Sequence, residues 1–130
     1  MSGVNYEVKS GKPSRLIHAT RYSMQGLKWM WRNEPSFRYE LFWLALLTPL
    51  NWYLDFSLMQ KLAIQMLMFL VIFAEVLNTA IEAVVDRVST EHHPLTGVAK
   101  DCGSAAVFIT MMMVVITWLV VLFDNGYIRL

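Results

Sequence analysis

Cysteine and charge are both scarce in this sequence. Its 130 residues include a single cysteine, Cys102, so neither an intrachain disulfide nor a multi-cysteine metal centre can form. Only 16% of the residues are charged, compared with about 25% in an average soluble domain. The formal net charge of +1 excludes a strongly basic nucleic-acid-binding protein, and we expect no nucleic-acid partner. The chain is instead 56% hydrophobic, which excludes a disordered protein.

The few charges gather near the ends of the chain and in one connection, leaving three long apolar segments between them. A transmembrane helix needs about 20 mainly apolar residues, and each segment is close to that length. The first segment is the weakest of the three, since it contains Arg38 and Glu40. The sequence therefore predicts an all-α membrane protein with one compact domain over residues 14–130 and no internal repeat. We expect the spans at about residues 36–54, 62–86 and 104–123.

The N-terminal part predicts a leader and a surface helix. Residues 1–13 have almost no apolar pattern and are expected to be a flexible leader. Over residues 14–34 the apolar side chains fall on about a third of a helical wheel, and basic residues flank them. A helix packed on a protein core remains an alternative, but the interleaved tryptophan and basic side chains favour a membrane interface. The apolar positions are Leu16, Ile17, Met24, Leu27 and Trp31.

Lysine and arginine predict the orientation, because cytoplasmic flanks of membrane spans are enriched in them. Most of these residues precede the first span, and Arg87 and Lys100 lie in the connection at residues 86–104. The opposite side has only Lys61 and Arg129. We therefore expect a multi-pass membrane protein with its N-terminus and the second connection in the cytoplasm.

Polar residues inside the second apolar segment are the strongest functional signal. Glu75, Asn78 and Glu82 are spaced three and four residues apart, and Asp86 follows four residues later, so all four share one helix face. A carboxylate in hydrocarbon costs several kcal/mol and is retained where it faces protein, water, a metal or a substrate path. Hydrogen bonding between packed helices is the alternative explanation.

A divalent cation would make this acidic cluster tolerable. Glu34 is expected near the same cytoplasmic interface as Glu82, and the carboxylates would otherwise repel one another. Mg²⁺ prefers oxygen ligands and fills its other positions with water and phosphate oxygens. The pattern thus predicts a metal–nucleotide complex.

The second connection, RVSTEHHPLTGVAKDCGS, offers groups suited to phosphates. Lys100 is a point charge, and Gly97 and Gly103 would allow a close approach of the backbone. His92 and His93 are adjacent and point in different directions in most conformations, so solvated loop residues are favoured over a zinc site.

Two segments carry a resemblance to a known family. The stretches AEVLNTAIEAVVDRV (residues 74–88) and TEHHPLTGVAKDCGSAAV (residues 90–107) resemble the prokaryotic diacylglycerol kinases, which are small integral-membrane lipid kinases. The stretch RLIHATRYSMQGLKWMWRNEPSFRYE (residues 15–40) is similar to that family's surface helix and its entry to the first span. The similarity covers nearly the whole chain after residue 13.

The resemblance implies a homotrimer of three-span protomers with composite active sites, in contact with membrane lipids. Such a trimer transfers the γ-phosphate of MgATP to the hydroxyl of diacylglycerol and forms phosphatidic acid. It implies that Glu75 is the catalytic base, that Glu34 and Glu82 hold Mg²⁺, and that Asn78 supports the active site.

The resemblance also implies two sets of binding residues. The positions that match nucleotide contacts are Arg15, Tyr22, Glu34, Glu82, Glu91, His92, His93, Lys100 and Asp101. The positions that correspond to lipid-substrate contacts are Arg15, Ala19, Thr20, Arg21, Tyr22, Ser23, Met24, Lys28, Trp29, Met30, Trp31, Ser36, Phe37, Arg38, Tyr39, Glu40, Glu75 and Ser104.

Two other functions stay open at this point. A kinase of the same family that acts on undecaprenol would also phosphorylate a primary alcohol on a long apolar tail. The aromatic-rich stretch WRNEPSFRYE resembles the diacylglycerol branch more closely. A small proton or cation transporter would also need Glu75 and Glu82 in a membrane helix, but it explains neither the surface helix nor the polar second connection.

Overall fold

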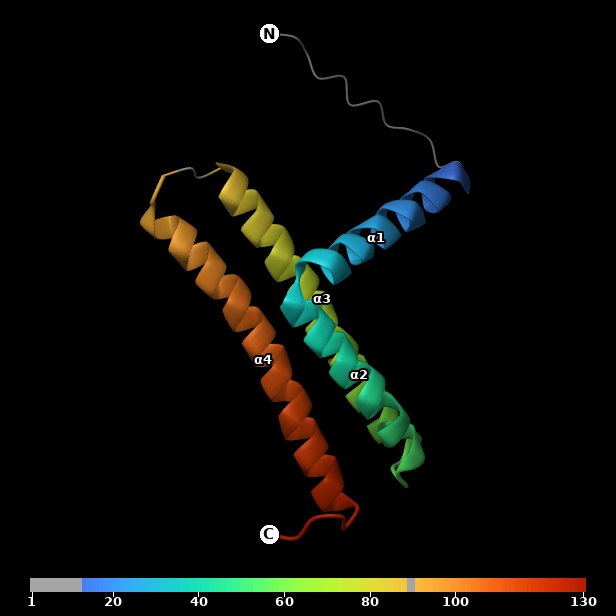
Figure 1. Ribbon diagram of the computed structural model, residues 1–130. Coiled ribbons are helices and arrows are strands. Elements are labelled where there is room, and N and C mark those ends of the chain that lie inside the picture. Colours follow the sequence, from blue (N-terminus) through green and yellow to red (C-terminus); the bar gives the residue numbers. More distant parts are fainter. Residues whose placement is uncertain (1–12, 89–90) are drawn as a thin grey trace. The chain divides into compact units, whose positions relative to one another are not determined.

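The computed structural model describes residues 13–88 and 91–130, and all regular structure in this part of the chain is α-helical. The predicted all-α fold class is thereby confirmed. The chain divides into two compact units, residues 1–33 and residues 34–130. The predicted leader lies outside the described residues except for Pro13, which begins the first helix. The helices are α1 (Pro13–Asn33), α2 (Pro35–Tyr53), α3 (Leu58–Val88) and α4 (Pro94–Asp124) (Figure 1).

The first unit contains α1, within one residue of the predicted surface helix at either end. Pro13 occupies the start of the helix, where its missing N–H is not needed. The hydroxyls of Thr20 and Ser23 each donate to the carbonyl oxygen four residues earlier, at 2.9 and 3.0 Å. Leu27 and Trp31, on the apolar stripe, are exposed. An exposed apolar stripe beside basic residues is typical of a helix that lies in a membrane interface.

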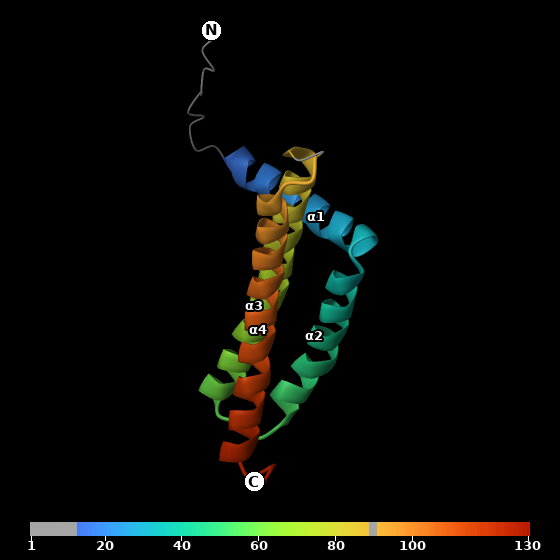
Figure 2. The same ribbon diagram turned by 90° about the vertical axis from the view of Figure 1, so that its left-hand side faces the viewer.

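In the second unit α3 is the central helix, because it packs against both α2 and α4. The three helices run alternately up and down, as Figures 1 and 2 show. By length and composition, α3 and α4 are the two described helices able to cross a membrane. The helix α2 has 19 residues against 31 in each of the other two, and it contains Arg38 and Glu40. The predicted span at about residues 36–54 therefore stays a prediction.

The apolar core lies near the α2–α3 turn and the end of α4. Ile64, with 1% of its surface exposed, is packed there beside Phe56, Met68 and Val121. The Phe56 ring also makes an edge contact with Trp118, with ring centres 6.0 Å apart. Because this core joins all three helices, it fixes their ends relative to one another.

Polar side chains strengthen the same region. The Gln65 amide, which is buried, accepts from Trp52 Nε1 at 3.2 Å and donates to Thr48 Oγ1 at 3.1 Å. Asn51 is fully buried and donates to the Lys61 carbonyl at 2.9 Å. Hydrogen-bonded polar groups of this kind are tolerated inside an apolar helix pair because their partners replace water.

The helix ends in this region are capped. Ser57 and Gln60 form a capping box at the start of α3, where Gln60 N–H donates to Ser57 Oγ at 3.2 Å and Ser57 N–H to Gln60 Oε1 at 3.0 Å. Gln60 also donates to Asp124 at 2.8 Å, which ties α3 to the end of α4. The chain leaves α4 through Gly126, whose φ of 75° suits glycine.

The structure corrects the expected second connection. Residues 86–104 were expected to form a polar loop, but α3 continues to Val88 and α4 begins at Pro94. Pro94 stands in the first turn of α4, and the His93 imidazole caps that turn by accepting from the Leu95 N–H at 3.2 Å. Helix start signals, which hydropathy does not register, therefore extend α4 ten residues before the apolar segment.

Candidate active site

An acidic cavity of about 420 Å³ opens among α2, α3 and α4. Its ionisable lining groups are all carboxylates: Glu40 from α2 and Glu75 and Glu82 from α3. The other lining residues are Ser36, Asn78, Ser104, Val107, Phe108 and Met111. The predicted site residues of the second and third apolar segments are thus brought together at one place.

The carboxylates of this acidic cavity are crowded. Glu75 is 5% exposed and Glu40 is 9% exposed, so little water reaches either group. Glu34 and Glu82 are near enough to repel the Glu75 carboxylate, and Glu75 in turn repels Glu40. Such a cluster stores unfavourable charge that a cation or a proton would relieve.

Glu34 owes its place to the start of α2. It occupies the cap position in an extended conformation, and Pro35 follows in the first helical turn. The residue before a proline is biased toward the extended region, so the sequence itself ends α1 and starts α2 at this point.

The acidic face of α3 has an internal order. Glu82 lies two turns from Glu75, about 10 Å along the helix axis. Asn78 stands between them and donates from Nδ2 to Glu82 Oε1 at 3.4 Å. The Asn78 Oδ1 atom is buried and has no hydrogen-bond partner among the described residues. Asn78 therefore constrains Glu82, whereas Glu75 is held by burial.

Gly103 of α4 lies directly against this face. A Cβ built on Gly103 would collide with Asn78 Oδ1 and would lie 3.2 Å from Asn78 Cγ. Gly103 was expected to approach a phosphate, and the structure shows that it approaches Asn78 instead. Gly97, expected to do the same, has nothing within 4 Å of such a Cβ. A glycine in a membrane helix is a known signal of close helix packing, so a helix contact at Gly103 was predictable, but its partner Asn78 was not.

The oxygen-only character of the acidic cavity suits a hard cation. Mg²⁺ is usually bound by one or two carboxylates together with water and phosphate oxygens. Among the described residues no three His, Cys, Asp or Glu side chains converge closely enough to hold a metal by themselves. The carboxylates present therefore fit such an ion only if substrate or water supplies the remaining ligands, and Glu34 is not among the residues that line the cavity.

A second cavity, about 510 Å³, surrounds the short connection between α3 and α4. Lys100 Nζ and Asp86 Oδ1 form an ion pair of 2.6 Å at its edge. Lys100 precedes the predicted span by four residues, and the hydrogen bond to Asp86, together with the charge of Asp86, raises its pKa. Lys100 therefore stays a cation. The predicted nucleotide residues that line this connection cavity are Glu91, His92, His93 and Lys100.

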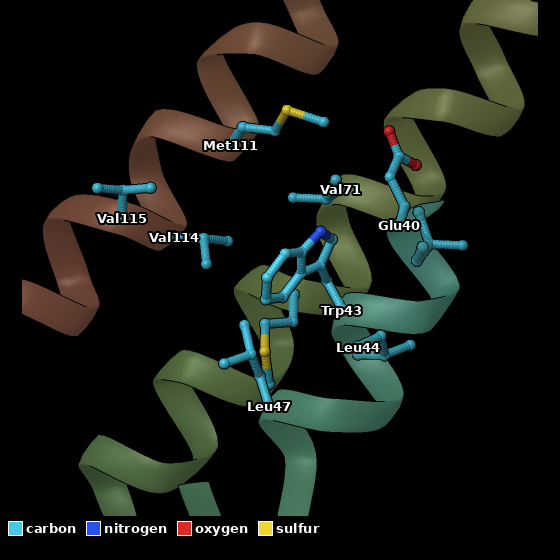
Figure 3. A pocket seen from close by; sticks show the side chains of 10 residues that line it. Glu40, Trp43, Leu44, Leu47, Val71, Met111, Val114 and Val115 are labelled. Atoms are coloured by element: carbon cyan, nitrogen blue, oxygen red, sulfur yellow. The ribbon is translucent and has the colours of Figure 1, made fainter. Parts of the chain in front are cut away.

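A third cavity, about 250 Å³, is almost entirely apolar and lies beside the acidic one. Figure 3 shows Met111 and Val114 of α4 facing Trp43 of α2 across it. Glu40 and Met111 line both this apolar cavity and the acidic cavity. Neither Trp43 nor Met111 was predicted as a site residue, because aromatic and apolar side chains are common in an apolar segment.

Other predicted residues are not among those that line these three cavities. On α2, Phe37 is buried, Arg38 is half-buried and Tyr39 is exposed. Asp101 is exposed on α4 and does not line the connection cavity. The rest belong to α1, in the separate first unit. They are Arg15, Ala19, Thr20, Arg21, Tyr22, Ser23, Met24, Lys28, Trp29, Met30 and Trp31.

Comparison with known proteins gives one consistent result. Residues 21–122 match the family model described as prokaryotic diacylglycerol kinase. A Haemophilus influenzae protein named diacylglycerol kinase is 44% identical over 110 residues, which cover 85% of this chain and 93% of that protein. The diacylglycerol kinase of Escherichia coli K12 is 42% identical, over 86% of this chain and 92% of that protein. The Pseudomonas aeruginosa protein of the same name is 40% identical, over 83% of this chain and 88% of that protein.

Proposed function

The chain belongs to the prokaryotic diacylglycerol kinase family, and we propose that it transfers the γ-phosphate of ATP to the hydroxyl of diacylglycerol at the acidic cavity, giving phosphatidic acid. The observation that supports this most directly is the joint burial of Glu75 and Glu40 in a cavity that Glu82 also lines. A carboxylate buried in such apolar helices costs free energy, so it is usually retained where it faces a substrate, an ion or a polar partner.

Glu75 is proposed as the general base. Its carboxylate accepts the proton of the acceptor hydroxyl as the oxygen attacks the γ-phosphorus. The bond from that phosphorus to the β–γ bridging oxygen breaks, and ADP leaves with the electron pair. Phosphoryl transfer depends mainly on positioning and on neutralising charge, so a small protein without a nucleotide-binding domain is sufficient.

Glu34 and Glu82 are proposed to hold Mg²⁺. When bound, the ion neutralises charge on the transferring phosphate and on the carboxylates around it. The Asn78 hydrogen bond keeps Glu82 oriented toward the cavity, and outer partners of this kind tune the ligands of a metal site.

The connection cavity is proposed to receive the nucleotide. Lys100 supplies a cation for the phosphates, and exchange of its Asp86 partner for a phosphate oxygen preserves its ion pairing. His92, His93 and Glu91 line the same space. The resemblance further implies nucleotide contacts from Arg15, Tyr22 and Asp101, which stay predictions.

The apolar cavity is proposed to receive part of the acceptor's hydrocarbon. It adjoins the acidic cavity at Glu40 and Met111. An alcohol with an apolar tail can therefore place its hydroxyl near Glu75 and its chain beside Trp43. The lipid contacts on α1 and at residues 36–40 are carried over from the resemblance.

The long apolar helices support a membrane protein, and we propose three spans with α2 as the first. Only 11% of the apolar window of α4 is buried within the chain, so its surface is available to lipid or to other copies. A homotrimer in a bacterial inner membrane, with the N-terminus in the cytoplasm, is proposed on the resemblance and on the distribution of lysine and arginine.

Phosphate transfer from labelled ATP, measured in mixed micelles, tests this function. Diacylglycerol, undecaprenol and no added alcohol are the three arms. Label in phosphatidic acid, with much less label in undecaprenyl phosphate, is the expected result. Preferential labelling of undecaprenol would identify undecaprenol as the acceptor. If ATP consumption did not depend on any added alcohol, the kinase function would be refuted and the transporter hypothesis would remain.

A further inference from the structure

We propose that Gly103 is a positioning residue. Because it has no side chain, α4 packs closely against the Asn78 amide, and this packing keeps the amide hydrogen-bonded to Glu82. This inference rests on the proposed function, in which Glu82 is a Mg²⁺ ligand. It concerns a residue of α4 that was expected only to approach a phosphate, and neither the family match nor that expectation connects it to Glu82.

The contact between the two helices is very close. A Cβ on Gly103 would overlap Asn78 Oδ1, approach Asn78 Cγ to 3.2 Å and lie 3.7 Å from Asn78 Cα. The 3.7 Å distance to the α3 backbone is an ordinary van der Waals contact, so the collision falls on the Asn78 side chain, and it is the amide that must move. Gly103 is itself buried, and α4 cannot simply present another face there.

A shift of the Asn78 amide would also affect Glu82, because the two side chains are hydrogen-bonded. An amide group is planar, so a displacement of Oδ1 also moves Nδ2, which donates to Glu82 Oε1 at 3.4 Å. That bond is already at the long limit for hydrogen bonding, so a shift of a few tenths of an ångström breaks it. Oδ1 has no other partner among the described residues, so packing against α4 is what holds the amide.

Gly26 offers a matched control. It lies inside α1, and a Cβ there would meet nothing within 4 Å. Gly26→Ala therefore makes the same chemical change in a helix without the collision. Gly26 is not among the proposed catalytic or binding residues.

The test uses the full chain with Gly103→Ala, Gly26→Ala and Glu82→Gln in micelles. The first readout is Mn²⁺ binding in the presence of a non-hydrolysable ATP analogue and without lipid acceptor, followed by electron paramagnetic resonance. The second readout is the split between KM for MgATP and kcat. Gly103→Ala should weaken Mn²⁺ binding and raise KM by about 10- to 100-fold, the usual effect of losing an outer partner of a metal ligand. Its kcat at saturating Mg²⁺ should stay near that of the parent, because Glu75 is untouched.

A double variant identifies the route of the effect. If Gly103 acts through the Asn78 amide, Gly103→Ala should add nothing in an Asn78→Ala background. Should Gly103→Ala fail to fold, the double variant must restore folding, since it removes the colliding group. Parental Mn²⁺ binding by Gly103→Ala, or an equal further loss in the Asn78→Ala background, would overturn the inference. Parental Mn²⁺ binding by Glu82→Gln would instead refute the metal role in the proposed function.

Discussion

Replacing Glu75 with glutamine tests the base directly. Glutamine keeps the shape and hydrogen-bonding capacity of glutamate but cannot take up the acceptor's proton. Glu75 is 5% exposed, so bulk water cannot easily serve as a substitute base. We therefore expect the rate of phosphate transfer to fall by about 10² to 10⁴, the usual contribution of general base catalysis. This loss corresponds to about 2.7 to 5.4 kcal/mol in activation free energy.

Glu40→Gln controls for the replacement of a buried carboxyl group in the same cavity. Glu40 lines the same cavity, is 9% exposed and repels Glu75. If Glu75 mattered only as a buried carboxyl group of this cavity, the two variants would lose similar amounts of kcat. We expect Glu40→Gln to change mainly KM for the lipid, since Glu40 lies where the apolar and acidic cavities meet.

Initial rates with labelled ATP, together with a separate measurement of MgATP binding, distinguish these effects. The Glu75→Gln protein should bind MgATP like the parent and transfer phosphate slowly at every lipid concentration. A variant that binds nucleotide normally and phosphorylates diacylglycerol at nearly the parental rate would remove Glu75 from the mechanism.

Other regions of the chain give three more predictions. Glu34→Gln and Glu82→Gln should each raise the Mg²⁺ concentration needed for half-maximal activity, and parental turnover at low Mg²⁺ would contradict the metal role. The double variant Leu27→Asp/Trp31→Asp should lower lipid turnover more than ATP binding, since each large apolar side chain contributes about 1.5–3 kcal/mol to interfacial burial. Unchanged kinetics with short-chain and long-chain diacylglycerols would exclude α1 from lipid capture. Ile64→Ala should cost about 2–5 kcal/mol of unfolding free energy, measured by denaturation in micelles, because Ile64 is fully buried in the core.

The sequence predicted the helices well where one physical signal dominates. The apolar run of α3 and the stripe of α1 were sufficient for helices close to the observed ones. The polar connection expected over residues 86–104 was wrong in part, since α4 already begins at Pro94. Hydropathy marks where a helix meets lipid, whereas His93 and Pro94 determine where the helix begins.

The candidate site was predictable along one helix but not between helices. The spacing of Glu75 and Glu82 placed both on the same face of α3, and the structure brings both to one cavity. The contact of Gly103 with Asn78 depends on the rotation and distance of α4 relative to α3, which no local pattern specifies. Trp43 was missed for the same reason, since its role follows from the cavity and not from its segment.

The early start of α4 places the residues proposed to contact the two substrates on one continuous helix. Lys100 and Ser104 are one turn apart on a continuous helix, one at the connection cavity and the other at the acidic cavity. A flexible loop would lose conformational entropy, about 1–2 kcal/mol for each residue ordered, when it closed on a phosphate. A helix that is already folded avoids that loss and moves as a stiff rod. In the proposed function, a displacement of Lys100 by bound nucleotide would therefore also displace Ser104, because both belong to the same rigid helix.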